Sequence, residues 1–188
     1  MFKFLIALLL VTPAAASAQT GFNAKEIPAS KYQGKIKEGK KWKDKDGEHV
    51  VVLTAASAKL YAYHFIKTDT GYRQIWRVYD HIDDCELDIV CEHVKGSLSV
   101  TDLDKDGTSE ISFVYLLSCR GDVSPDTKKL ILYEGETKYA IRGTNMLSFP
   151  NAPSTGGEKQ IDKNLKSAPA SILAHANSQF DKWGNVKY

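Results

Sequence analysis

The 188-residue sequence lacks the features that mark several large classes of protein. After residue 18 no apolar run approaches the ~20 residues of a membrane-spanning helix, so we expect no transmembrane segment once a leader is removed. The formal net charge is only +2, which argues against nucleic acid as a partner. The motifs GxSxG and HExxH and a phosphate-binding glycine loop are absent, and the five histidines are scattered. The sequence therefore assigns no catalytic residue.

An apolar leader is the first feature that is present. Residues 1–18 begin with one lysine, continue with an uninterrupted apolar run over residues 4–11 and end in small residues at Ala18. This order is typical of a secretory signal peptide. We therefore predict a periplasmic or secreted protein, with a flexible lead-in at residues 19–30 and a single β-rich domain over residues 31–188.

Three cysteines follow the leader, and export would place them where disulfides persist. Because three is odd, at most one intramolecular pair can form. Cys85–Cys119 is favoured, since both lie at the ends of strand-like runs and the closed loop of ~35 residues would give roughly 3–4 kcal/mol. Cys85–Cys91 would close a much smaller loop and stabilise less. The preferred pairing leaves Cys91 as a free thiol.

Short runs of aromatic and β-branched residues alternate with turn residues through most of the chain. This spacing predicts a mainly β fold, an antiparallel meander of hairpins that is propeller-like or a sandwich. One C-terminal helix is expected near residues 169–183, and residues 145–159, with two prolines and two glycines, are expected to form a long loop. The predicted strands are 49–54, 59–66, 72–79, 97–100, 111–117, 130–133 and 138–142.

The acidic loop, residues 102–110, is the most informative segment. Carboxylates at positions 1, 3 and 5, glycine at position 6 and a glutamate at position 9 can surround one ion, with a backbone carbonyl available at position 7. Oxygen ligands of this kind favour Ca²⁺ over Mg²⁺, and a plain polar turn is the alternative. The predicted metal-site residues are Asp102, Asp104, Asp106, Thr108 and Glu110.

The acidic loop is not a helical calcium hand, because position 12 is Phe113, at the start of a predicted strand. Its spacing resembles the β-hairpin DxDxDG loops of FG-GAP repeats, as in integrin heads. That resemblance implies a calcium site in which the residue at the ninth position completes the set of ligands. A second DKDG sequence occurs in residues 44–48, which we call the first loop. Trp42 replaces its first carboxylate, so this copy is predicted to be a plain turn.

Charge is separated along the chain. Residues 25–45 hold eight lysines against three acidic residues, and residues 80–110 hold ten acidic residues against two lysines. Two solvated faces are the simpler explanation. The alternative is a lysine strip that binds an anionic glycan such as lipopolysaccharide. Its members are Lys31, Lys35, Lys37, Lys40, Lys41 and Lys43.

Several segments together resemble a family of small exported bacterial proteins labelled as surface-polysaccharide-biosynthesis proteins. They include WKDKDGE at residues 42–48, TDLDKDG at 101–107 and DVSP at 122–125. The resemblance implies a link to envelope glycans and supplies no catalytic residues.

The first hypothesis is thus a calcium-stabilised binding or accessory factor in surface polysaccharide assembly, whose partner is an anionic surface glycan or an envelope protein. The alternatives are a glycan-processing enzyme using acidic residues near Asp83 and Asp84, or a structural envelope protein.

Overall fold

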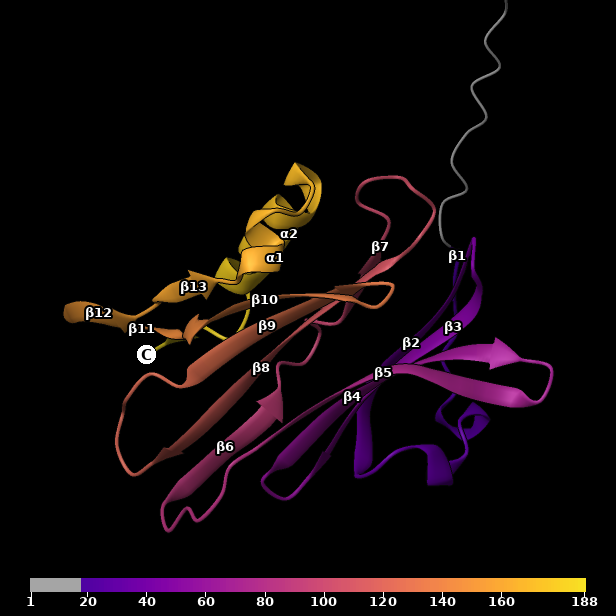
Figure 1. Cartoon of the computed structure of the whole chain (residues 1–188). Coiled ribbons are helices and arrows are strands. Elements are labelled where there is room, and N and C mark those ends of the chain that lie inside the picture. Colours follow the sequence, from indigo (N-terminus) through magenta and orange to yellow (C-terminus); the bar gives the residue numbers. More distant parts are fainter. Residues whose placement is uncertain (1–17) are drawn as a thin grey trace, which may run out of the picture.

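The computed structural model describes residues 18–188, so the predicted signal peptide, apart from Ala18, lies outside the described residues. Two large antiparallel sheets face each other, and a helix covers the outer side of the second sheet (Figure 1). The predicted mainly β fold of antiparallel hairpins with a C-terminal helix is confirmed, and the facing sheets are consistent with a sandwich.

The first sheet is a meander in which each strand pairs with its neighbour in sequence. Tight hairpins join its four long strands, so the order of these strands in the sheet follows from the short connections between them. Its strands are β1 (Ala18–Thr20), β2 (Lys35–Asp44), β3 (Gly47–Ala56), β4 (Lys59–Thr68) and β5 (Gly71–His81).

The second sheet has the order β13-β10-β9-β8-β6, with the short β7 also paired to β8. A single stretch of chain between β5 and β6 crosses from the first sheet to the second. The strands are β6 (Asp88–His93), β7 (Ser99–Thr101), β8 (Glu110–Arg120), β9 (Thr127–Glu134), β10 (Thr137–Thr144) and β13 (Lys159–Ile161).

The strand β3 shows how the layers are stacked. Val51 and Leu53 point into the core between the two sheets, whereas Val50 and Val52 point to the opposite face. That opposite face is covered in part by Ile27, which is 3% exposed. A continuous apolar run is therefore buried on both sides, as expected for an interior strand.

Residues 19–30, predicted as a flexible lead-in, contribute to β1 and to two 3₁₀ turns, Ala24–Glu26 and Ala29–Lys31. The burial of Ile27 fixes this segment against the first sheet.

The C-terminal helix α2 (Ala170–Lys182) follows the short helix α1 (Lys163–Lys166) and begins after Pro169. Ile172, Ala176 and Phe180 recur every four residues and pack on the second sheet. At its C-terminal end the buried Lys128 ammonium donates to Phe180 O at 2.9 Å, which satisfies a carbonyl left open by the helix end. Burial lowers the pKa of Lys128 to about 8.

The segment predicted as a long loop over residues 145–159 instead contains most of a small third sheet. Its strands are β11 (Met146–Phe149) and β12 (Ala152–Gly156), joined by β14 (Val186–Lys187) from the C-terminus, and β13 begins at residue 159. Pro153 is tolerated because β12 is an edge strand and Pro153 has no partner in the pairing register.

The predicted Cys85–Cys119 disulfide is confirmed, and Cys91 is a free, partly buried thiol. The bond ties the crossover segment to the end of β8. A disulfide is consistent with an exported protein in an oxidising compartment. Among residues 18–188, no helix is both long and apolar enough to cross a membrane.

Candidate functional site

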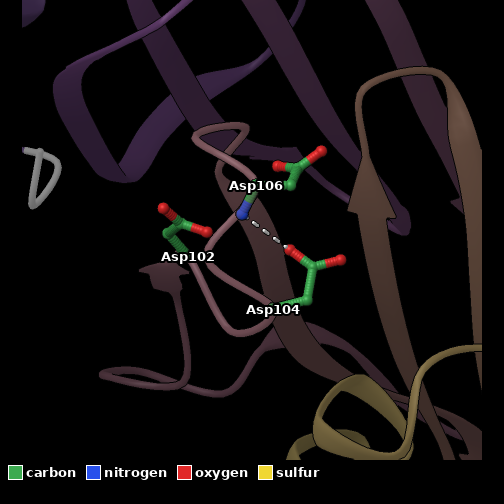
Figure 2. Close-up of side chains that lie close together, drawn as sticks. All are labelled: Asp102, Asp104 and Asp106. Atoms are coloured by element: carbon green, nitrogen blue, oxygen red, sulfur yellow. Dashed lines mark hydrogen bonds between the residues drawn. The ribbon is translucent and has the colours of Figure 1, made fainter. Parts of the chain in front are cut away.

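The acidic loop joins β7 to β8 and gathers its three aspartates around one turn. One carboxylate oxygen from each of Asp102, Asp104 and Asp106 lies within 4.8 Å of the other two. The Asp106 backbone N–H donates to Asp104 Oδ1 at 3.2 Å (Figure 2). Gly107 has φ +85°, a left-handed conformation that would strain a residue with a side chain. The turn thus places together the three carboxylates that the spacing predicts as ligands.

Asp106 already has several partners within the protein. It accepts hydrogen bonds from the Thr108 backbone N–H at 2.6 Å and from the Thr108 hydroxyl, and Lys45 Nζ lies 3.2 Å from its Oδ2. These hydrogen bonds and the nearby ammonium hold the pKa of Asp106 below its usual range. Lys45 comes from the first loop, so the positive charge beside Asp106 is the ammonium group of a side chain from the other half of the fold.

Glu110, the ninth-position residue, is only 1% exposed. Its Oε2 accepts hydrogen bonds from the Leu103 backbone N–H at 2.8 Å and the Thr101 hydroxyl at 3.3 Å, whereas the buried Oε1 has no partner. Burial raises the pKa of Glu110 to about 7. Carboxylate oxygens of Glu110, Asp104 and Glu134 lie within 4.8 Å of one another. A second acidic cluster therefore adjoins the three aspartates, and the sequence motif gave no indication of Glu134.

The first loop packs directly against the acidic loop, although 60 residues separate them in sequence. The Lys45 backbone N–H donates to Gly107 O at 3.1 Å, and the Ser109 N–H donates to Asp44 Oδ2 at 3.2 Å. The two DKDG sequences thus form a contact between the sheets. The first loop is a turn, as predicted, and it is hydrogen-bonded to the acidic loop.

Asp44 also ends a chain of buried polar side chains. It accepts the Trp42 indole N–H at 3.1 Å, and its Oδ1 lies 3.0 Å from His49 Nε2. His49 Nδ1 lies 3.0 Å from His64 Nε2, so one ring donates to the other, while His64 Nδ1 is buried without a hydrogen-bond partner. Burial lowers the pKa of His49, and that of His64 to about 3. Both rings are at most 4% exposed, so this chain belongs to the core.

A cleft of about 760 Å³ opens between β6 and the part of the first sheet where β2 begins and β3 ends. A second hollow of about 300 Å³ shares Ser57, Cys91 and Glu92 with it, so the two form one groove along β6. The charged side chains that line the cleft are Lys35, Lys37, Lys95, Glu38 and Glu92.

The structure divides the predicted lysine strip. Lys35 and Lys37 line the cleft, where they are joined by Lys95 from the turn between β6 and β7. Lys41 instead forms ion pairs with carboxylates of the first sheet and the lead-in, Glu48 and Glu26. The remaining members Lys31, Lys40 and Lys43 do not line the cleft.

The uncharged polar groups of the cleft are not poised for proton transfer. His93 Nε2 lies 3.2 Å from Thr54 O and 3.1 Å from Tyr61 O, so it donates to backbone carbonyls of the first sheet. Burial lowers the pKa of His93 to about 4 and raises that of the Cys91 thiol to about 11. At pH 7 the cleft therefore contains a neutral imidazole and an undissociated thiol.

The carboxylates considered for glycan cleavage lie outside the cleft. Asp83 and Asp84 are exposed on the segment that joins the two sheets, and Asp83 Oδ2 lies 2.7 Å from His81 Nε2. Neither residue is among those that line the cleft.

The fold and this groove define a β-sandwich-like protein with a polar, lysine-bearing cleft. Comparison with protein-family models, with curated proteins and with solved structures finds no match to the chain.

Proposed function

We propose that this chain is an exported, non-catalytic binding protein for an anionic surface glycan, acting in surface polysaccharide assembly in the periplasm or outside the cell. The single observation that carries the proposal is the cleft beside β6, in which three lysines converge from two sheets. A glycan bearing carboxylates or phosphates offers oxygens that ammonium groups bind, and a cleft of this size holds a few sugar units.

The chemistry of the cleft supports binding over catalysis. A glycosidase needs two carboxyl groups on opposite sides of the bond that breaks. The two cleft carboxylates have other surroundings: Glu38 Oε2 accepts the Gly96 backbone N–H at 3.1 Å, which ties β2 to the turn after β6. Glu92 is exposed and is the second carboxylate of the cleft. The three lysines outnumber the two carboxylates, so the cleft favours an anionic ligand.

Calcium is the second part of the proposal. The cluster of Asp102, Asp104 and Asp106 supports an ion in the acidic loop, with the oxygen-only chemistry that Ca²⁺ prefers. Because this loop contacts the first loop, an ion there would stiffen the junction between the sheets. Its role is structural, since none of these aspartates lines the cleft.

The test of glycan binding is calorimetric titration of the purified protein with oligogalacturonate, using neutral oligodextran of the same length as a control. We expect binding of oligogalacturonate that weakens with added salt, and no binding of dextran. The double variant K35Q/K37Q should weaken binding at least about tenfold, since it removes two of the three cleft ammonium groups.

The matched control is K40Q/K43Q, which makes the same charge change on the same strand outside the cleft. It should stay within about twofold of the wild type. Equal losses in both double variants, or no binding by the wild type, would contradict the proposal. If D83N and D84N alter the surface glycan of cells while K35Q/K37Q does not, the enzyme alternative is supported in its place.

A further inference from the structure

A pair of glutamates sits opposite each other in the second sheet at the base of the acidic loop. Glu110 begins β8 and Glu134 ends β9, and the two are register partners. Like charges at directly opposed positions destabilise a sheet unless something compensates them. Asp104 of the acidic loop brings a third carboxylate within 4.8 Å of both.

Within the described residues 18–188, no lysine, arginine or histidine forms an ion pair with any of these three carboxylates. Glu134 Oε2 accepts the Tyr139 hydroxyl at 3.0 Å, which is a neutral donor. The cluster of Asp102, Asp104 and Asp106 differs, because Lys45 sits beside it. The cluster that contains the buried Glu110 therefore has no positively charged side chain among the described residues to compensate its three carboxylates.

The unpartnered oxygen of Glu110 is the independent sign of a ligand. The residue is 1% exposed, and its Oε1 is buried without a hydrogen-bond partner while Oε2 is held by Leu103 and Thr101. A buried acceptor left without a partner destabilises the folded state, and more so when it is charged. Its carboxylate is fixed in place by those two donors and lies beside Asp104 and Glu134.

We propose that Asp104, Glu110 and Glu134 form a calcium-binding position of their own, beneath the acidic loop and separate from the cluster of Asp102, Asp104 and Asp106. Three carboxylates with no nitrogen or sulfur donor suit a hard cation, and two glutamates can bind it through both oxygens, as the high coordination number of Ca²⁺ requires. The Tyr139 hydroxyl donates to Glu134 Oε2 and so helps to orient this carboxylate.

This position gives the ion a ligand that the DxDxDG spacing does not contain. Glu134 belongs to the hairpin of β9 and β10, so the ion would tie the acidic loop to that hairpin. The inference does not depend on glycan binding in the cleft, and the two fail separately.

The experiment is calcium titration of the chelator-treated wild-type protein by calorimetry, with terbium luminescence sensitised by nearby tyrosine as a second reading. E134Q removes one ligand charge but keeps an acceptor for Tyr139, and should weaken calcium binding at least about tenfold. D106N removes a carboxylate from the loop cluster alone, so it should weaken an ion bound in that cluster but leave calcium affinity at the position of Asp104, Glu110 and Glu134 within about twofold. E136Q is the matched control, because Glu136 is an exposed residue of the same hairpin turn outside the cluster.

Circular dichroism without calcium establishes that each variant is folded. If E134Q fails to fold, or if E134Q and D106N both weaken binding, crystals of the wild type soaked in terbium decide. An anomalous peak at about 2.3–2.6 Å from oxygens of Glu110 and Glu134 supports the proposal. A peak ringed only by Asp102, Asp104 and Asp106, no peak, no calcium binding by the wild type, or tenfold weakening by D106N with E134Q unchanged overturns it.

Discussion

The two DKDG loops have the same four residues and opposite environments. In the first loop, Asp44 turns inward, with a side chain only 5% exposed, and accepts hydrogen bonds from the first sheet and from the acidic loop. In the acidic loop the equivalent Asp104 is exposed and lies among other carboxylates. The difference arises from what surrounds the turn: Trp42 and His49 give Asp44 partners in the core, whereas Asp104 has neighbours of its own charge. One short motif therefore serves packing in one place and fits ion binding in the other.

The largest expected effect comes from removing the Asp44 carboxylate from the first loop. Asp44→Ala would leave the N–H groups of Trp42, Asp46 and Ser109 without their acceptor. We expect a loss of about 3–5 kcal/mol in the free energy of unfolding, measured by urea denaturation. The equivalent Asp104→Ala, in calcium-free buffer, should cost no more than about 1 kcal/mol, because it removes an exposed charge. Similar losses at the two positions would show that the environments do not decide the outcome.

The next effect is a dependence of stability on pH that originates at His64, which adjoins the first loop through His49. The folded protein holds the pKa of His64 at about 3, below the ordinary value of 6.5, because the ring is buried. A base with a lowered pKa contributes stability above pH 6.5, and that stability is lost as the pH falls towards 3. We expect roughly 3–5 kcal/mol to be lost over this range, with His93, whose pKa is about 4, adding loss of the same sign.

Unfolding by urea at several pH values between 3 and 8 measures this loss. The variant His64→Gln should have a flatter dependence on pH than the wild type, whatever its stability at pH 8. An unchanged slope would mean that other groups cause the acid sensitivity.

The smallest expected effect concerns the ion pair that joins the first loop to the acidic loop. Lys45 and Asp106 form an exposed ion pair, so Lys45→Met should hardly change the free energy of unfolding. It should, however, raise calcium affinity by up to about threefold at low salt, because a neighbouring positive charge is removed, and the gain should fade at high salt. Calorimetry at two salt concentrations measures both. A drop in affinity would show that Lys45 supports the ion site.

The sequence was most informative where a pattern depends on local residues. Alternation in residues 75–79 puts Trp76 and Val78 on one face of the strand and Arg77 and Tyr79 on the other. In the structure Trp76 and Val78 are 7% and 5% exposed, whereas Arg77 is exposed and Tyr79 is 41% exposed. The disulfide could be predicted for the same reason, since the two cysteines follow recognisable strand ends.

Prediction failed where partners come from distant parts of the chain. The short strands β11 and β12 contain turn residues and gain their structure from pairing with each other and with the C-terminus. The strand β2 is rich in lysine and has little apolar pattern, but Trp42 and its neighbours hold it in the sheet. Glu134 belongs to no motif and reaches Glu110 only through the register of β8 and β9. Long-range pairing of this kind leaves no trace in spacing.

The single crossover between β5 and β6 has a consequence for the order of folding. All strands of the first sheet precede the crossover in the chain, so its hairpins can form by local contacts before the second sheet has been synthesised. The bond from Ser109 to Asp44 joins the halves across 65 residues and can form only afterwards. Until the second sheet forms, Asp44, His49 and the inner face of the first sheet are exposed to water. During synthesis, the first half of the chain therefore exposes apolar surface that the second half later buries.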